Sequence, residues 1–250
     1  MSRADAFEIV FGINAVETAL RVRPEAVTDL WVNAERTDAR MQALEGVARE
    51  VGVRVQHVGS KTLDKVAVGG THQGVALRRK REPNIDWAVA LKEITDQLPP
   101  LIVALDGVMD PHNFGACIRS AAAVGAHTFL YPRSRGGSVT PTVRRVASGG
   151  SELVALQAVP NLSRALTQLG HCGYQVLGLA GESDPPLFTH PVDSPIVLVA
   201  GTEQDGLRRL TREACTSLVR IPMASHLESL NVSVAVGVAL FDIANRKGLL

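Results

Sequence analysis

The sequence has few cysteines and no long apolar run. Its three cysteines, Cys117, Cys172 and Cys215, lie far apart, are odd in number and form no C-x-x-C pair. This usage favours reduced thiols in a cytosolic protein and argues against a zinc site. No apolar run comes near the roughly 18 residues that a membrane span needs, and no signal peptide is recognisable, so we expect neither membrane insertion nor secretion.

Several fingerprints of nucleotide-binding and catalytic sites are also missing. Neither G-x-G-x-x-G nor G-x-x-x-x-G-K-S/T follows a candidate strand, which disfavours an ordinary dinucleotide-binding or P-loop protein. No Ser–His–Asp set has nucleophile-elbow spacing, and no His/Asp cluster has the spacing of metal ligands, so we expect no metal. The net charge of +1 leaves nucleic-acid binding open, because RNA contacts would depend on local basic patches.

The composition is that of an ordinary globular protein, with 46% apolar and 20% charged residues. A chain of 250 residues can form one large domain or two small ones. We predict an N-terminal domain at 1–80, a linker at 81–99 and a C-terminal domain at 100–250. The linker contains Pro83 and Pro99–Pro100, which bracket a helix starting near Asp86.

The N-terminal part is typical of a small α/β unit, because helical and strand-like apolar patterns alternate along it. The patterns predict, in order, a helix with Ile13, Val16 and Leu20 on one face, a strand around 30–32, a helix at 41–51, a strand at 53–57, a short helix capped by Ser60 and a strand at 74–77.

The densest basic run of the chain follows the last of these strands and consists of Arg78, Arg79, Lys80 and Arg81. Runs of like charge commonly form a solvated face, and this interpretation stays open. The position between a strand and a proline-containing linker also suits contacts with phosphates. We therefore keep these four residues as candidate nucleic-acid contacts.

From residue 101 onward, apolar strands and helices alternate. Strands are predicted at 101–105, 128–131, 153–156, 175–179, 196–200 and 218–221, with helices between most of them, such as 161–169 ended by Gly170. Strands that are apolar throughout and joined by helices indicate a parallel sheet with helices on either side. Ligands of such sheets bind beyond the carboxyl ends of the strands.

Two of these strands lead into polar loops. After 101–105, Asp110 is suited to cap a helix that has Pro111 at its first position. Asn113 and Arg119 follow on that helix; they do not share one tight face, but both can flank one pocket. After 196–200, the loop 201–206 has two glycines that let a ligand approach the backbone, while Glu203 can accept hydrogen bonds.

A third loop lies between the last strand and an unusual helix, within residues 221–245. Pro222 breaks the strand, and Ser229, Leu230 and Asn231 open the helix. From 232 to 239 its side chains are small or β-branched, which suits close packing on several sides rather than high intrinsic helicity. Its polar N-terminal end can meet polar ligand atoms, although a buried helix with an ordinary cap explains the pattern equally.

Together, the three loops resemble the three sequence motifs of the SpoU/TrmH family. The chain has D-x-x-x-D-P-x-N-x-G-A-x-x-R-S at 106–120, G-x-E-x-x-G at 201–206 and I-P-M-x-x-x-x-x-S-L-N-V-S-V-A at 221–235. Members of this family are RNA ribose 2′-O-methyltransferases of the SPOUT class that depend on S-adenosyl-L-methionine (AdoMet). Segments 11–16 and 72–76 resemble the family's N-terminal substrate-binding domain, so the resemblance covers nearly the whole chain.

The resemblance implies an α/β fold with a small L30e-like N-terminal domain and a C-terminal parallel-sheet SPOUT domain containing a deep trefoil knot. It also implies a cytoplasmic enzyme with RNA as its substrate. The branch of the family that the chain resembles most methylates a guanosine ribose in the peptidyl-transferase P loop of 23S rRNA. A homodimer through the C-terminal domain is expected, and the apolar run 232–243 agrees with it because a solvent-facing helix would carry more polar residues.

Matched position by position, the resemblance implies roles for single residues. The catalytic positions of the three motifs correspond to Asn113, Arg119, Glu203, Ser229 and Asn231. The positions that hold AdoMet correspond to Gly201, Ile221, Met223 and Leu230. Arg119 would act on the ribose 2′-hydroxyl as a base or, since a neutral guanidinium is costly, as an anchor for RNA phosphate. The motif spacers at 204–205 and 224–228 vary, which concerns the substrate more than the chemistry.

Three alternatives remain. The same chemistry on tRNA or on another rRNA site, including the antibiotic-resistance type, is the first, and the N-terminal domain argues against the short tRNA-specific form. A non-catalytic RNA-binding protein is the second, and it would have no reason to keep all five catalytic residue types. An unrelated nucleotide-binding α/β protein is the third, and the missing glycine fingerprints argue against it.

Overall fold

A computed structural model describes residues 6–68, 70–81, 85–134, 136–224 and 229–250 of the chain. It divides into two compact units, one with residues 1–83 and 139–153 and the other with 84–138 and 154–250. The predicted division of the chain into an N-terminal domain at 1–80, a linker at 81–99 and a C-terminal domain at 100–250 stays a prediction. Pro83 of the predicted linker lies outside the described residues, whereas the linker helix is present as α4 (Trp87–Gln97), capped by Asp86.

The first unit contains a four-stranded mixed sheet in the order β1-β4-β2-β3. Its strands are β1 (Phe7–Phe11), β2 (Val27–Asn33), β3 (Val55–Val58) and β4 (Val75–Lys80). β4 is antiparallel to both of its neighbours, and β2 is parallel to β3. Strand β1 was not predicted from the sequence. Its five residues FEIVF contain only one polar side chain, and the strand is recognisable only from its pairing with β4.

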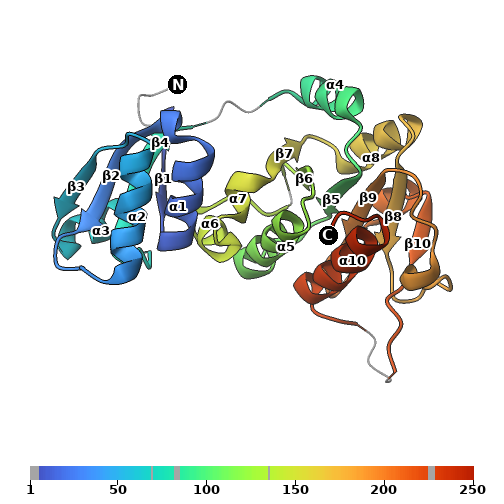
Figure 1. Cartoon of the computed structure of the whole chain (residues 1–250). Coiled ribbons are helices and arrows are strands. Elements are labelled where there is room, and N and C mark those ends of the chain that lie inside the picture. Colours follow the sequence, from blue (N-terminus) through green and yellow to red (C-terminus); the bar gives the residue numbers. More distant parts are fainter. Residues whose placement is uncertain (1–5, 69, 82–84, 135, 225–228) are drawn as a thin grey trace. The chain divides into compact units, whose positions relative to one another are not determined.

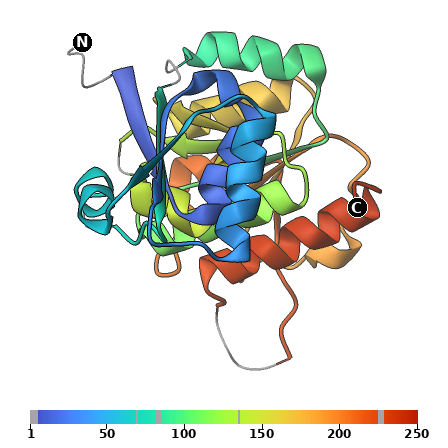
Figure 2. The ribbon, with the colours of Figure 1, turned by 60° about the vertical axis from the view of Figure 1, so that its left-hand side comes forward.

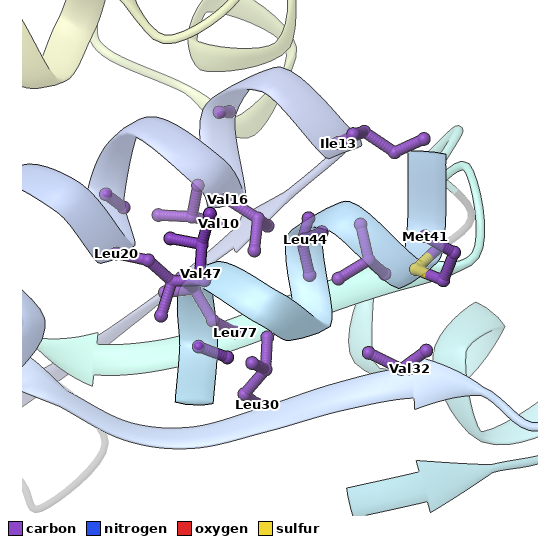
Figure 3. Packing of buried hydrophobic residues seen from close by; sticks show 14 residues of the cluster. Val10, Ile13, Val16, Leu20, Leu30, Val32, Met41, Leu44, Val47 and Leu77 are labelled. Carbon is purple, nitrogen blue, oxygen red and sulfur yellow. The ribbon is translucent and has the colours of Figure 1, made fainter. Parts of the chain in front are cut away.

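Helices cover both faces of this sheet (Figure 1). The larger core lies under α1 (Ile13–Val22) and α2 (Ala39–Glu50), whose apolar faces meet alternate residues of β1, β2 and β4, as Figure 3 shows. A smaller core lies under α3 (Ser60–Val66), where Leu63 packs with Phe11 and Ala76. The predicted capping by Ser60 is wrong, because Gly59 holds the cap position and Ser60 is already helical. The unit also contains the short 3-10 helix η2 (Pro24–Ala26), α6 (Pro141–Ala147) and α7 (Gly150–Leu153).

The second unit contains a six-stranded, entirely parallel sheet in the order β10-β8-β9-β5-β6-β7. Its strands are β5 (Leu101–Leu105), β6 (Thr128–Pro132), β7 (Ala155–Val159), β8 (Gln175–Leu179), β9 (Ile196–Ala200) and β10 (Ser217–Val219). This confirms the predicted parallel α/β sheet. The strand predicted at 153–156 is shifted, because residues 150–153 form α7 and β7 begins at Ala155. The last strand ends at Val219, before the predicted 221.

Two sets of helices cover the opposite faces of this sheet, which is visible in both Figure 1 and Figure 2. On one face, α4 and α8 (Leu162–His171) bury Ile94 and Leu166 against alternate strand residues such as Ala104. On the other face, Phe114 of α5 (Pro111–Ala123) makes edge-to-face contacts with Phe129 and Tyr131. There α5 lies beside α10 (Val232–Arg246). The short α9 (Arg209–Glu213) and the 3-10 helix η3 (Leu187–Thr189) complete the unit.

The direction of the connections reverses between the two central strands. From β5 the chain proceeds to β6 and β7 on one side, whereas β8 and β10 lie on the far side of β9. Leu105 of β5 pairs with Ala200 of β9, and Asp106 donates its backbone N–H to the Ala200 carbonyl at 2.8 Å. The loops after β5 and β9 therefore leave the sheet side by side, at the position where open parallel sheets bind ligands.

Candidate active site

Three elements of the second unit bring polar side chains together at this edge of the sheet. Asn113 lies in the first turn of α5, Glu203 lies in the loop after β9, and Asn231 caps α10. Asp110 fixes the start of α5, because its carboxylate accepts the backbone N–H of Asn113 at 2.8 Å. Capping thus sets the position from which the Asn113 side chain extends.

The Glu203 carboxylate is the centre of this cluster. Its Oε1 accepts hydrogen bonds from Asn231 Nδ2 at 2.7 Å, Asn113 Nδ2 at 3.1 Å and the backbone N–H of Val232 at 3.3 Å. Asn231 Nδ2 also donates to Asn113 Oδ1 at 2.9 Å. A carboxylate in front of the N-terminus of α10 is further favoured by the helix dipole. The cluster therefore ties together all three sequence motifs through one acidic side chain.

The amide of Asn231 has only one workable orientation. Its Oδ1 accepts the backbone N–H of Ser233 at 3.0 Å and that of Val234 at 3.4 Å. An oxygen is required on this side and a donor is required toward Glu203, so the amide cannot be flipped without losing bonds on both sides. The same side chain thus starts the helix and positions the acid.

The loop after β9 is a tight turn that needs glycine at its first position. The backbones of Thr202 and Gly206 exchange two hydrogen bonds of 3.0 and 3.1 Å. A Cβ on Gly201 would lie 2.0 Å from the Gly206 carbonyl oxygen, so no side chain fits there. The end of the turn is anchored by the buried Asp106, which accepts the backbone N–H of Arg208 at 2.9 Å. These contacts hold Glu203 at the tip of a rigid loop.

A cavity of about 610 Å³ opens beside this cluster, within the range typical of ligand pockets. It is lined by residues that follow β8, β9 and β10 and by the start of α10. All four residues predicted to hold a cofactor, Gly201, Ile221, Met223 and Leu230, lie in its wall. Glu203 and Ser229 line it as well. The structure therefore gathers the second and third motifs around one cavity.

The cavity wall contains an ion pair that was not predicted from the sequence. Glu182, in the loop after β8, pairs with Arg212 of α9, and both line the cavity. A hydrogen bond from its own backbone N–H and one from Arg212 hold the pKa of Glu182 below its ordinary value, so the carboxylate is charged at neutral pH. The signal was available, since Gly181-Glu182-Ser183-Asp184 follows an apolar strand in the same way as the other polar loops.

The two remaining predicted catalytic residues stand outside the hydrogen-bond cluster. Arg119 is an exposed residue of α5, almost two turns beyond Asn113, and its side chain makes no hydrogen bond or ion pair with another described residue. Ser229 is exposed at the rim of the cavity. Residues 225–228, part of the third motif's spacer, lie outside the described residues. Of the five predicted catalytic residues, the structure brings Asn113, Glu203 and Asn231 into direct contact.

The basic run on β4 is split by the pleat of the strand. Arg79 is buried, donates to Glu8 at 2.8 Å and pairs with Glu152, while Arg78, Lys80 and Arg81 are exposed. Burial opposes the charge of Arg79, but the carboxylates of Glu152 and Glu8 outweigh it and raise the pKa of the guanidinium. Because it is buried and its donors are used inside the protein, Arg79 is a structural residue in this fold, whereas its three neighbours remain accessible to solvent.

Two further observations concern metals and membranes. Across the described ranges, no group of three or more His, Cys, Asp or Glu side chains is arranged to hold a metal ion. In the same part of the chain, no helix is both long and apolar enough to span a bilayer.

Burial raises the pKa of the Cys117 thiol, on α5, to about 12. This cysteine is therefore protonated and unreactive at neutral pH.

The chain matches two family models that together cover most of its length. Residues 100–241 match the SpoU rRNA Methylase family, and residues 9–84 match the RNA 2′-O ribose methyltransferase substrate binding domain. The chain therefore belongs to the SpoU rRNA methylase family, which confirms the resemblance inferred from the three motifs.

Individual relatives extend along nearly the entire chain. The 23S rRNA (guanosine-2′-O-)-methyltransferase RlmB of Pseudomonas aeruginosa is 43% identical over 244 residues, covering 96% of this chain and 97% of the relative. RlmB of Pseudomonas syringae pv. tomato is 42% identical over 243 residues, covering 96% of each chain. Among solved structures, the SpoU methyltransferase AviRb of Streptomyces viridochromogenes in complex with AdoMet has a TM-score of 0.77 at 21% identity, covering 99% of this chain and 94% of that one. The last comparison concerns the fold alone.

Proposed function

We propose that this protein transfers a methyl group from AdoMet to the 2′-hydroxyl of a guanosine ribose in 23S rRNA. The observation that carries the proposal is the contact of Glu203 with Asn113 and Asn231 at the rim of the cavity. This contact joins residues of three distant motifs at the ligand-binding edge of the sheet. Near-full-length relatives that are 23S rRNA (guanosine-2′-O-)-methyltransferases support the substrate.

The cavity suits AdoMet in shape and charge. Apolar side chains such as Leu179 and Leu230 offer a surface for the adenine ring, and the backbone at Gly201 is free of any side chain. In its wall Glu182 is paired with Arg212, and the further carboxylates of Glu203 and Asp205 leave net negative charge that suits a cofactor with sulfonium and ammonium groups. Gly201, Ile221, Met223 and Leu230 would hold the cofactor. When bound, it supplies a methyl group that is already activated for transfer to an oxygen.

The residues of the cluster would act mainly by positioning. Glu203 locks the amides of Asn113 and Asn231, which leaves them preorganised to orient the ribose. Ser229, at the rim, would hydrogen bond the substrate. Arg119 is exposed and charged, so we assign it to RNA phosphate and to charge that develops on the ribose oxygen, rather than to proton abstraction.

The RNA would also contact the N-terminal domain. Arg78, Lys80 and Arg81 are exposed there and suit phosphates, whereas Arg79 is withdrawn from this role. We place the target in the peptidyl-transferase P loop, following the motif resemblance, and the enzyme in the cytoplasm, where rRNA is assembled into subunits.

We further propose a trefoil knot in the C-terminal domain and a homodimer. Val234, Val238 and Phe241 on α10 are 38–49% exposed, which leaves an apolar stripe for a second copy of the chain. Light scattering at micromolar concentration should give twice the chain mass of 26.6 kDa. A mass of one chain would contradict the dimer without affecting the proposed chemistry.

The proposal is tested by mapping 2′-O-methylation at single-nucleotide resolution in total rRNA and tRNA, from cells with and without the gene. We expect one guanosine of 23S rRNA to lose its methyl group on deletion and to regain it with the intact gene. With the Glu203→Gln gene, the methyl group should return more slowly and to a lower level than with the intact gene. A change confined to tRNA, or no change in any RNA, would contradict the proposal.

A further inference from the structure

One face of the N-terminal sheet combines half-buried aromatic rings with exposed cations. Because side chains alternate along a strand, Arg79 points toward Glu8, while Arg78 and Lys80 point to the opposite face. On that face Arg78 meets Phe7 of β1 and Trp31 of β2. Helix α3 covers only part of this face, around Phe11 and Ala76. We call Phe7, Trp31, Arg78 and Lys80 the aromatic-basic face.

Arg78 is held in a fixed geometry against both rings. Its guanidinium carbon lies 5.4 Å from the ring centroid of Phe7 and 5.9 Å from that of Trp31, within the range of cation–π attraction. Its Nε donates to Asp29 Oδ2 at 2.7 Å. The side chain is nevertheless 44% exposed. A planar cation is thus preorganised beside two aromatic rings and still accessible from solvent.

A cavity borders this face, and its surroundings carry excess positive charge. The cavity has a volume of about 490 Å³ and is lined by Phe7 and Arg78 of the face and by Ile9, Phe11, Val66 and Arg81, among others, whereas Trp31 and Lys80 lie outside its lining. Glu8, which also lines it, is neutralised by Arg79 and Arg144, and Asp29 is neutralised by Arg78. Lys80 and Arg81 are exposed and pair with no carboxylate among the described residues. An apolar hollow with flanking cations is the pattern that binds unpaired nucleotides.

We infer that the aromatic-basic face is a stacking site for unpaired bases of the RNA substrate. A base would stack on Trp31 or Phe7 beside the guanidinium plane of Arg78, while Lys80 and Arg81 contact the flanking phosphates. Duplex RNA cannot use such a site, because its bases are already stacked and paired. The inference rests on the proposed function for the identity of the substrate, and it adds that this domain selects an unpaired segment of that RNA.

The two tryptophans allow a direct test on the full-length chain. Trp87 is the other tryptophan and lies in the second unit, so Trp87→Phe leaves Trp31 as the only indole reporter. An oligoribonucleotide of about six unpaired nucleotides should quench the Trp31 fluorescence saturably. A duplex of the same sequence should leave it unchanged at the same phosphate concentration. Absence of quenching, or equal quenching by the duplex, would overturn the inference.

Variants separate stacking from charge. Trp31→Leu and Arg78→Lys should each weaken binding of the unpaired oligonucleotide about tenfold with an unchanged salt dependence, because stacking releases no counterions. Lys80→Ala should instead reduce the salt slope by about 0.7. Phe188→Leu, which changes a 42% exposed aromatic of the second unit, is the matched control and should bind like the parent chain. Thermal midpoints verify folding, and Arg78→Lys keeps the test valid if Trp31→Leu unfolds.

The test also distinguishes the inference from the proposed function. Parental affinity in both Trp31→Leu and Arg78→Lys would reduce the face to a structural cation–π cluster, even if methyl transfer to rRNA is found. Quenching that is specific for unpaired RNA, together with no methyl transfer to any RNA, would sustain the stacking site and contradict the proposed function.

Discussion

Asn231 connects the start of a helix to the acid of the site. Its Nδ2 donates to Glu203 at 2.7 Å, while its Oδ1 accepts the backbone N–H of Ser233 at 3.0 Å and caps α10. The position of the donor therefore depends on the helix being capped by that residue. This explains why an asparagine stands at the cap. Aspartate would cap the helix without offering a donor to Glu203, and the hydroxyl of serine ends one bond closer to the backbone than the Nδ2 atom that reaches Glu203.

Asn231→Ser should separate these two roles. Serine is a good N-cap, so the thermal midpoint should change little, while Glu203 loses its shortest hydrogen bond and methyl transfer falls about tenfold or more. Asn161→Ser is the matched control, because Asn161 caps α8 through the backbone N–H of Arg164 at 3.0 Å and lies outside the cluster. Both variants are compared by thermal melting and by single-turnover transfer of labelled methyl. Equal activity of the two would contradict the role of the donor.

Glu203→Gln should lower methyl transfer by roughly 10- to 100-fold, because hydrogen bonds to a charged acceptor contribute about 1.5–3 kcal/mol. A glutamine also presents an NH₂ group that competes with the two asparagine amides. Asp205→Asn removes a charge from the same loop without any side-chain contact to Asn113 or Asn231, and it should retain most of the activity. A larger loss in Asp205→Asn than in Glu203→Gln would assign the effect to charge in the cavity rather than to the cluster.

Arg119→Ala should abolish methyl transfer while the thermal midpoint and AdoMet affinity stay near the parental values, because the side chain is exposed and makes no hydrogen bond or ion pair with a described residue. Arg119→Lys should retain a measurable fraction of the rate if the residue acts through its charge. Arg164→Ala, another exposed arginine on a helix of the second unit, serves as control. Cofactor affinity is measured by calorimetry and transfer by single-turnover assay. Full activity of Arg119→Ala would remove this residue from the site, and a lysine variant as inactive as alanine would point to guanidinium geometry.

Arg79→Met should destabilise the first unit by about 3 kcal/mol, at the lower end for a buried ion pair that loses one partner. Among the described residues, Glu8 and Glu152 would keep Arg144 as their one cationic partner, at 2.8 and 3.1 Å. Arg81→Met, an exposed neighbour, should stay within about 0.5 kcal/mol of the parent. Urea unfolding of both variants in the Trp87→Phe background, followed by Trp31 fluorescence, measures the difference. Equal midpoints would show that Arg79 is not structural.

The sequence predicted the sheet of the second unit well, because its strands are apolar throughout and end in recognisable polar loops. The strands at 101–105, 175–179 and 196–200 agree with β5, β8 and β9 residue for residue. The bounds of the two edge strands, β7 and β10, were predicted less accurately, because these strands have fewer buried residues and therefore weaker apolar patterns. The parallel arrangement followed from the helical connections, but the reversal of order between β5 and β9 did not, because periodicity contains no information about strand neighbours.

The site was only partly accessible to sequence reasoning. The motifs indicated Asn113, Glu203 and Asn231 as separate residues, and only the fold shows that one carboxylate oxygen joins them. The basic run was treated as a single patch, whereas the alternation of β4 sends Arg79 to the interior. That error had a signal, because a strand extending through residue 80 must place successive side chains on opposite faces.

Methyl transfer by the purified protein decides whether it acts on the ribose of a guanosine in 23S rRNA. Labelled AdoMet is incubated with the enzyme and unmodified 23S rRNA, and the product is mapped by nucleotide. We predict a single 2′-O-methylated guanosine in the peptidyl-transferase P loop, with a transfer rate roughly 10- to 100-fold lower for Glu203→Gln under the same single-turnover conditions. Label on a base, label on tRNA alone, or no transfer by a folded protein that binds AdoMet would contradict the account.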